Sequence, residues 1–168
     1  SGDFSVSFWA NTSILSNAYA EVVAQGSSNQ SGFYIGYAPP NGEIRLGDDW
    51  QPTGVFFPAD SLWHFYSLVK NVSNTYFYID DSLVASKGSA IGNPTATSFW
   101  IGMQFNNDEH FNGFIDEVMV WNTALSSSNI LDYMSCSPTG NETDLVGYWN
   151  FEEGSGSTVL DVSGNGNN

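Results

Sequence analysis

Alternation of apolar and polar residues is the feature that most limits how this chain can fold. In residues 4–10 (FSVSFWA), every second residue beginning with Phe4 is apolar, while Ser5, Ser7 and Trp9 fall on the opposite face. A period of two is typical of a β-strand with one buried face, because successive side chains of a strand point to opposite sides. The pattern therefore predicts a half-buried strand at the start of the chain.

Similar short segments recur along most of the chain, separated by turn residues. Asn41-Gly42 favours a hairpin return, and Asp80-Asp81 favours a tight turn. Short strands at regular spacing favour an antiparallel sandwich or barrel. Residues 126–134 (SSSNILDYM) instead predict a short helix capped by its serines. We expect further strands at 20–24, 32–37, 43–47, 63–70, 75–79, 82–86, 98–103, 113–121 and 145–151.

The charge of the chain is its most unusual compositional feature. Its 168 residues include 18 Asp and Glu but three Lys and Arg, which gives a formal net charge of −15. Such a chain repels nucleic acid and anionic membrane surfaces and attracts cations, so we expect no nucleic-acid partner. Two interpretations remain open: one or more divalent-ion sites, or the solvated acidic surface of an extracellular or saline-adapted protein.

Cysteine content and hydropathy exclude two further classes of protein, namely disulfide-stabilised domains and membrane-spanning proteins. The single cysteine, Cys136, excludes an internal disulfide framework. No apolar run is long enough to span a bilayer, so we expect no membrane insertion. The sequence opens directly on a strand pattern without a signal peptide, which indicates a piece of a longer protein.

Three segments together resemble laminin-G-like and pentraxin-like domains of the concanavalin A-like lectin/glucanase superfamily. Residues 60–70 (DSLWHFYSLVK) resemble its Trp-His strand, and residues 75–84 (TYFYIDDSLV) resemble its hairpin, with Asp81 where glycine is usual. Residues 111–126 (FNGFIDEVMVWNTALS) resemble its Ile-Asp-Glu-Val strand. The resemblance implies an all-β, two-sheet antiparallel jelly-roll sandwich, concanavalin A-like, with one short helix after the last strong strand.

The resemblance also suggests a domain organisation. We expect a laminin-G-like β-sandwich over residues 1–134, a linker over 135–144, and a strand with a Gly- and Asn-rich tail over 145–168. Residues 145–168 resemble the opening of a family domain, although they stand at the end here. We favour their completing the same sandwich, because an unpaired aromatic strand is a liability in water. The alternative is that they begin the next repeat of a tandem array.

Oxygen-rich side chains make Ca²⁺ the expected cofactor, since this ion takes about six to eight oxygen ligands. Related laminarinases hold a structural Ca²⁺ between the opening and last strands, and that resemblance implies a site at Asp116 with the acidic pair of the tail. Asp116 alternates with valines that we expect in the core, so it needs an ion or hydrogen bonds from backbone turns. The candidate calcium ligands are Asp116, Glu152, Glu153, Asn150, Asp108 and Asp161.

Sugars are bound by aromatic rings beside carboxylates and amides. Two loops have this composition: 46–51 (LGDDWQ) and 104–110 (QFNNDEH), of which the second falls where pentraxin-like relatives place calcium ligands. Trp50 is either a stacking surface or a packed loop residue. The candidate carbohydrate-binding residues are Asp48, Asp49, Trp50, Gln104, Asn106 and Asn107.

Catalysis is not expected. A retaining glycosidase needs two carboxylates about 5 Å apart, and the laminarinase-type pattern E-x-D-x-x-E is absent from the sequence. We therefore expect a non-catalytic carbohydrate-binding or adhesion module of a larger extracellular, cell-surface or virion-surface protein. Its expected partners are glycans or cell-surface polysaccharide and neighbouring domains of the same polypeptide or assembly. The alternative is a structural repeat of a surface fibre, filament or layer without a small-molecule ligand.

Overall fold

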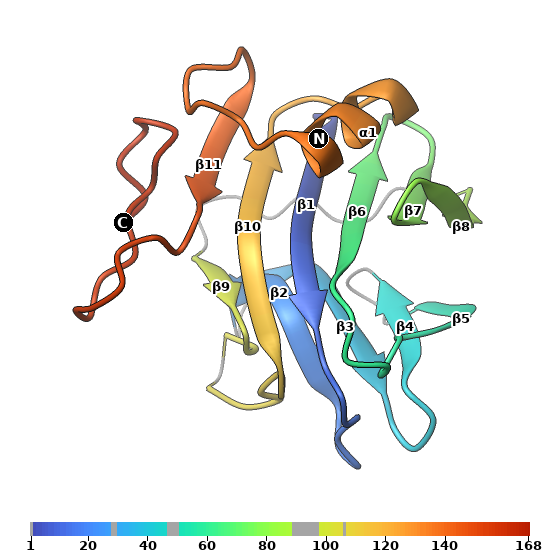
Figure 1. Cartoon of the computed structure of the whole chain (residues 1–168). Helices are drawn as coiled ribbons and strands as arrows, with labels where there is room; N and C mark the ends of the chain where they lie inside the picture. The colour runs from blue at the N-terminus through green and yellow to red at the C-terminus, as the bar shows by residue number, and fades with distance from the viewer. Residues whose placement is uncertain (1, 28–29, 47–50, 89–97, 106) are drawn as a thin grey trace. The chain divides into compact units, whose positions relative to one another are not determined.

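The structure, a computed structural model, describes residues 2–27, 30–46, 51–88, 98–105 and 107–168. Its strands form two antiparallel sheets, of six strands in the order β11-β10-β1-β6-β7-β8 and of five in the order β5-β4-β3-β2-β9 (Figure 1). The elements are β1 (Phe4–Asn11), β2 (Ala20–Ser27), β3 (Gln30–Ala38), β4 (Glu43–Leu46), β5 (Gln51–Phe56), β6 (His64–Lys70), β7 (Thr75–Ile79), β8 (Ser82–Lys87), β9 (Phe99–Ile101), β10 (Phe114–Trp121), α1 (Ser127–Ser135) and β11 (Leu145–Trp149).

The chain divides into two compact units, each built from segments far apart in the sequence. The six-stranded unit comprises Gly2–Ala10, His64–Gly88 and Ile115–Asn168, and the five-stranded unit comprises Asn11–Trp63 and Ser89–Phe114. Within the ranges that the structure describes, no helix is both long and apolar enough to cross a membrane.

β1 and β6 show how the alternation builds the six-stranded sheet. Phe8 lies opposite Tyr66, and their rings stack with centroids 5.3 Å apart. Ser7 lies opposite Ser67 on the other face, where the two hydroxyls share a hydrogen bond of 2.8 Å. Directly opposed residues of two strands share a face, so the predicted period of two is confirmed here.

The expectation that β1 is half-buried was wrong, because both of its faces are covered. Ser5 and Ser7 are 0% and 1% exposed. The Ser5 hydroxyl donates to the Thr123 carbonyl at 2.8 Å and accepts from the Leu125 N–H at 2.9 Å. The segment that follows β10 therefore covers the serine face, and its backbone groups satisfy the buried hydroxyl.

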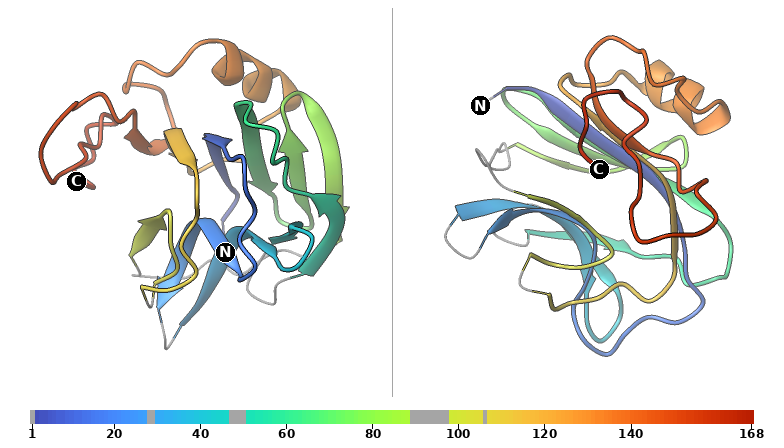
Figure 2. Two further views of the ribbon diagram at one scale, coloured as in Figure 1. Left: turned by 60° about the horizontal axis from the view of Figure 1, so that its bottom comes forward. Right: turned by 90° about the vertical axis from the view of Figure 1, so that its left-hand side faces the viewer.

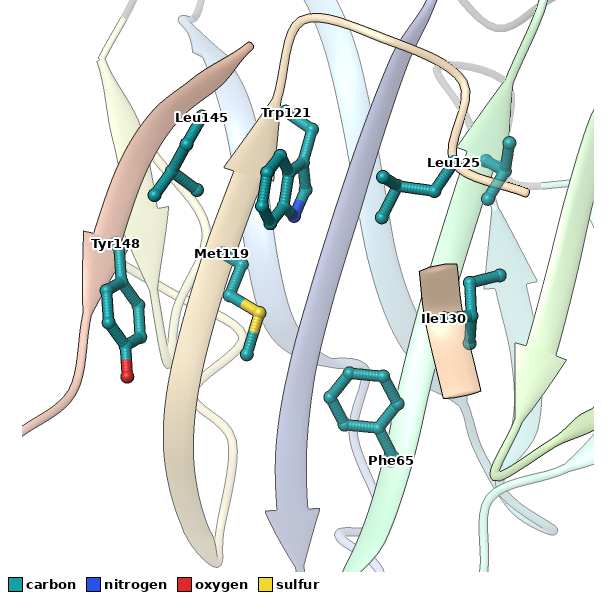
Figure 3. Close-up of a cluster of buried hydrophobic side chains, with 8 residues drawn as sticks. Phe65, Met119, Trp121, Leu125, Ile130, Leu145 and Tyr148 are labelled. Carbon is teal, nitrogen blue, oxygen red and sulfur yellow. The ribbon is translucent and has the colours of Figure 1, made fainter. Parts of the chain in front are cut away.

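The helix α1 packs on the six-stranded sheet where the sequence predicts a helix. Ser126 caps it: the Ser126 hydroxyl accepts from the Asn129 N–H, and the Asn129 side chain accepts from the Ser126 N–H in return. Ile130 is the buried residue of the helix, and Figure 3 shows it among the side chains of the sheet. The buried cluster consists of Phe65, Val69, Met119, Trp121, Leu125, Ile130, Leu145 and Tyr148.

β11 forms the edge of the six-stranded sheet. It pairs antiparallel with β10, with Val118 opposite Trp149 and Met119 opposite Tyr148. The tail then loops back beside β11 (Figures 1 and 2), where the Val162 N–H donates to the Tyr148 carbonyl at 2.7 Å. The strand expected over 145–151 thus has a partner within this chain. The division into domain, linker and tail stays a prediction.

The five-stranded sheet is centred on β3. Val23, Ile35 and Leu46 form a buried row across β2, β3 and β4. The hairpin between β3 and β4 confirms the Asn41-Gly42 signal: Gly42 has a positive φ of 75° and donates its N–H to the Ala38 carbonyl at 3.0 Å. Glycine adopts this conformation without steric cost.

The strand β5 was not expected from the sequence. It pairs with β4 at the edge of the five-stranded sheet, with Arg45 opposite Pro52 and Glu43 opposite Phe56. Pro52 and Gly54 weaken the strand signal, because proline cannot donate a ladder hydrogen bond and glycine packs no side chain. Proline is tolerated in a strand at a sheet edge.

Candidate functional site

A loop that follows β9 lies along the beginning of β2 in the five-stranded unit. We call residues 102–111 the 102–111 loop. Its two ends are joined by a hydrogen bond of 2.9 Å from the Phe111 N–H to the Gly102 carbonyl. Gly102 donates to the Val22 carbonyl and Glu21 donates to the Glu109 carbonyl, both at 2.8 Å. The loop is therefore fixed to β2 through its backbone.

Hydrogen bonds inside the loop present polar side chains to solvent. Gln104 N–H donates to the Asp108 carbonyl at 3.0 Å, and Asn107 N–H donates to the Gln104 carbonyl at 3.1 Å. Asn107 and Glu109 have positive φ angles of 61° and 53°. Asparagine tolerates this region, whereas glutamate adopts it only where the surroundings enforce it. Asn107 and Asp108 are exposed at the tip.

Aromatic rings lie beside this loop on one face of the five-stranded sheet. The rings of Tyr34 and Phe105 are in contact, with centroids 6.1 Å apart. Trp100 is half-buried, and its indole N–H is buried without a hydrogen-bond partner. We call this the Tyr34 face; register places Ala24, Tyr34 and Trp100 in one row on it and Glu21, Gly36 and Arg45 in the next.

Glu21 is the most constrained acidic residue near the loop. It is 0% exposed, and neither carboxylate oxygen has a hydrogen-bond partner. The carboxylate lies over Gly36: a Cβ atom there would be 2.6 Å from Glu21 Oε2 and 2.1 Å from the Ala20 carbonyl oxygen. Burial, and then the charge of Glu109, hold the pKa of Glu21 well above its usual range.

Glu109 links Glu21 to the exposed part of the loop. The Gln104 side-chain amide donates to Glu109 Oε2 at 3.1 Å. Burial, and then the charge of Asp108, raise the pKa of Glu109. The Asp108 carboxylate accepts the Glu109 N–H at 2.8 Å. The carboxylates of Glu21, Glu109 and Asp108 thus form a series that begins at the sheet and ends at the exposed loop tip.

The structure brings together part of the predicted carbohydrate set. Gln104 and Asn107 share the 102–111 loop with Asp108, which was predicted as a calcium ligand. Glu109 lies in the predicted loop 104–110 but was not among the named ligands, and Glu21 was not predicted at all. The signal that could have found Glu21 is a single acidic residue within the apolar run 20–24 (AEVVA). The predicted residues Asp48, Asp49, Trp50 and Asn106 lie outside the described residues.

A second acidic cluster lies in the six-stranded unit. Asp116 on β10 is half-buried, and its carboxylate accepts the Glu117 N–H at 2.9 Å. The Tyr148 hydroxyl donates to the Glu117 carboxylate. The pKa of Asp116 is raised overall, mainly by burial. The backbone hydrogen bond from Glu117 lowers this pKa, while the charges of Glu117 and Glu152 raise it further. Glu117 has a positive φ of 51°, which interrupts the alternation between Asp116 and Val118.

The other predicted ligands of the tail serve its own loops. Asp161 accepts the N–H groups of Tyr148, Ser163 and Asn167 at 2.9–3.0 Å and the Asn167 side-chain amide at 2.7 Å. Glu153 accepts the Leu160 N–H at 2.7 Å.

The remaining tail candidates, Asn150 and Glu152, are half-buried and exposed, respectively. Within the described ranges, no group of three or more Asp, Glu, His or Cys side chains is arranged to hold a metal ion. Calcium binding by the predicted set stays a prediction.

A family model of the concanavalin A-like lectin/glucanases superfamily matches residues 1–131, which is more than half of the chain. The chain belongs to that superfamily. No curated protein sequence matches the chain.

Solved structures of several other proteins share its fold. A proposed carbohydrate-binding protein from Bacteroides ovatus superimposes with a TM-score of 0.80 at 15% identity, over 98% of this chain and 50% of that protein. Domain 4 of an extracellular arabinanase from Geobacillus stearothermophilus, solved with arabinotriose, superimposes with a TM-score of 0.62 at 19% identity. The match covers 78% of this chain and 66% of that domain's chain. A heptameric pentraxin from Limulus polyphemus superimposes with a TM-score of 0.64 at 13% identity. The match covers 95% of this chain and 79% of the pentraxin chain.

These likenesses confirm the predicted fold class, a mostly β concanavalin A-like sandwich with two antiparallel sheets and one short helix. The chain spans about half the length of the Bacteroides ovatus protein. At these identities the comparisons establish the fold alone.

Proposed function

We propose that this domain is a non-catalytic glycan-binding module of a larger extracellular or surface protein. Its superfamily contains lectins and glucanases. Two similar structures are a proposed carbohydrate-binding protein and an arabinanase domain in complex with arabinotriose. Both support a sugar ligand by analogy of fold.

The observation that carries the proposal is the 102–111 loop on the Tyr34 face. Asn107 and Asp108 expose an amide and a carboxylate on a backbone held by internal hydrogen bonds. Phe105 packs on Tyr34 beside them. Sugar hydroxyls exchange hydrogen bonds with amides and carboxylates, while the apolar faces of sugar rings pack on aromatic side chains. A loop fixed before binding loses little conformational freedom on binding.

The charge of the domain narrows the class of glycan. A net charge of −15 repels sulfated and uronic-acid-rich chains. We therefore infer that the ligand is a neutral oligosaccharide or polysaccharide.

The buried position of Glu21 argues against glycoside hydrolysis at this loop. A retaining enzyme needs two carboxylates that both reach the scissile bond. Glu21 and Glu109 are neighbours, but Glu21 is buried completely. It therefore cannot contact a sugar as the loop stands.

Binding to an array of neutral and charged glycans tests the proposal. We expect binding to at least one neutral glycan, weakened about five- to tenfold by Asn107→Gly, because one neutral hydrogen bond is lost. Glycine keeps the positive φ of this position. Asp132→Ala, an exposed change on α1 in the other unit, is the matched control and should bind as the wild type does.

An exposed aromatic pair elsewhere in the five-stranded unit gives the experiment a competing site. Trp63 and Phe114 are both exposed, with ring centroids 6.4 Å apart. If Trp63→Ala abolishes binding and Asn107→Gly has no effect, the ligand binds at this pair instead of the loop. Absence of binding to every glycan would overturn the proposed function.

We further propose calcium as a ligand of the second acidic cluster. The charge of Glu152 is close enough to raise the pKa of Asp116, a repulsion that a bound cation would relieve. A melting temperature that is unchanged by calcium, with and without a chelator, contradicts this assignment.

A further inference from the structure

Two large aromatic side chains are exposed side by side in the five-stranded unit. Trp63 and Phe114 are 45% and 69% exposed, and their ring centroids lie 6.4 Å apart. We call them the Trp63 pair. Leu62, which precedes Trp63 in the chain, is 60% exposed. Single exposed apolar residues are common on protein surfaces, whereas exposed apolar residues in contact with one another mark a place where a ligand or partner binds.

Thr12, the residue after β1, joins the two segments that carry these rings. Ser61 and Asn112 each lie two residues before a ring of the pair. The Thr12 carbonyl accepts the Ser61 N–H at 3.1 Å, and the Thr12 hydroxyl donates to the Asn112 carbonyl at 2.7 Å. The Asn11 side-chain amide adds a hydrogen bond of 2.8 Å to the Ser61 carbonyl. The pair is therefore formed before a ligand arrives, and little conformational freedom is lost on binding.

The backbone is constrained beside each ring of the pair. Ser61 has a positive φ of 67°, a conformation that costs free energy in a residue other than glycine. Beside it, the Leu62 N–H donates to the Asp60 carboxylate at 2.9 Å. At Gly113, a Cβ atom would lie 2.3 Å from the Asn11 carbonyl oxygen, so only glycine fits between the two segments. Constrained backbone that carries exposed side chains is typical of binding sites.

The size of the pair determines what kind of ligand it fits. A stable protein interface buries about 800 Å² on each partner, whereas one aromatic side chain contributes about 150–250 Å² even when it is buried fully. Two partly exposed rings therefore offer far less area than a protein partner needs. A sugar ring matches one aromatic ring in size and packs its apolar face on it. Its hydroxyls can bond to the exposed Asn112 and to the Trp63 indole N–H.

The pair is continuous with the 102–111 loop along the chain. Phe114 follows Asp108 at the loop tip by six residues, so the two are at most about 22 Å apart. Asn112 and Gly113, which lie between them, are exposed. We propose that the Trp63 pair is a stacking subsite that extends the loop, so that the ligand is a neutral oligosaccharide chain bound along its length and not a single terminal sugar. This inference rests on the proposed function, because it takes the loop as a sugar-binding site.

Calorimetric titration with oligosaccharides of increasing length tests the extended site. The probes are arabino-, cello-, laminari-, manno- and xylo-oligosaccharides, from the disaccharide to the hexasaccharide. We expect at least one series to bind, with an affinity that rises with chain length. Trp63→Ala should weaken binding of the hexasaccharide about tenfold, because a stacked ring is lost, and should leave the shortest member that binds unchanged. Phe114→Ala should act in the same direction, whereas Asn107→Gly should weaken binding at every length.

Two control variants accompany these titrations. Trp63→Phe keeps an aromatic ring and should retain most of the affinity for the hexasaccharide. Leu131→Ala removes a side chain of α1 that is 47% exposed, close to the exposure of Trp63, and should bind as the wild type does.

Each other outcome overturns the extended site. Unchanged hexasaccharide affinity in both Trp63→Ala and Phe114→Ala would show that the pair does not contact the sugar. Equal weakening at every chain length would place the whole ligand at the pair. Self-association of the wild type in ultracentrifugation, abolished by Trp63→Ala, would assign the pair to a second copy of the chain. A wild type that binds none of the five series also overturns this inference, and the glycan array decides separately whether the proposed function stands.

Discussion

At the scale of single residues, Asp161 organises the C-terminal tail. Burial alone would raise the pKa of its carboxyl group, but hydrogen bonds from Ser163, Asn167 and Tyr148 outweigh burial and lower the pKa to about 2. The ionised carboxylate therefore stabilises the folded tail beside β11.

Replacing Asp161 by Asn should destabilise the protein by about 2 kcal/mol at neutral pH, because the charge is lost and the new amide N–H₂ faces donors of Asn167. The folded-state pKa lies below the unfolded value, so this stabilisation is complete above about pH 4 and is lost as the pH falls toward 2. Urea unfolding in chelator at several pH values measures the difference. A difference that stays constant down to pH 2 would contradict this role for Asp161.

At the same scale, the local sequence pattern predicted the burial of individual side chains wrongly. Ser5 and Ser7 were expected at the exposed positions of an alternating strand, yet both are buried. Glu21 read as an ordinary residue of a strand, yet it is the buried acid of the candidate site. Alternation reports which residues share a face; which segments cover that face is decided by contacts distant in the sequence.

At the scale of elements, α1 stabilises the six-stranded sheet by packing one buried side chain on it. Ile130 is 1% exposed and packs into the cluster that covers the six-stranded sheet (Figure 3). Its neighbour Leu131 is 47% exposed. The two residues have similar size and differ mainly in burial, so they form a matched pair.

Ile130→Ala should lower the free energy of unfolding by about 2–4 kcal/mol, since a buried aliphatic side chain is removed and a cavity remains. Leu131→Ala should cost less than about 0.5 kcal/mol, because it removes an exposed side chain. Urea denaturation of both variants measures the contrast. Equal effects would show that α1 is not packed as the structure places it.

Elements also differ in how clearly the sequence marks them. The β3–β4 hairpin and α1 carry local signals, in Asn41-Gly42 and Ser126, and both form where predicted. β5 contains Pro52 and Gly54 and carries no such signal. It becomes a strand because β4 offers it a free edge, which is a property of the sheet and not of the segment.

At the scale of the whole molecule, the net charge of −15 acts on stability. Self-repulsion of like charges destabilises a folded chain, and salt screens that repulsion. We expect the melting temperature to rise as NaCl increases from about 0.01 to about 0.5 M, over which the screening length falls several-fold.

The measurement is made in chelator, so that a specific divalent ion does not contribute. Tetramethylammonium chloride is the control, because a bulky cation screens charge without occupying an oxygen-lined site. A rise with both salts is expected. A rise with NaCl alone would indicate specific cation binding instead of general screening.

The sequence by itself determined the class of the fold, because alternation, turn residues and helix caps act over a few neighbouring residues. It also placed Gln104, Asn107 and Asp108 in one loop, since they are adjacent in the chain. The tertiary structure alone decided that β11 pairs with β10 and that Glu21 lies buried against Glu109. Pairing and burial join residues separated by tens of positions, and no local pattern encodes which of them will meet.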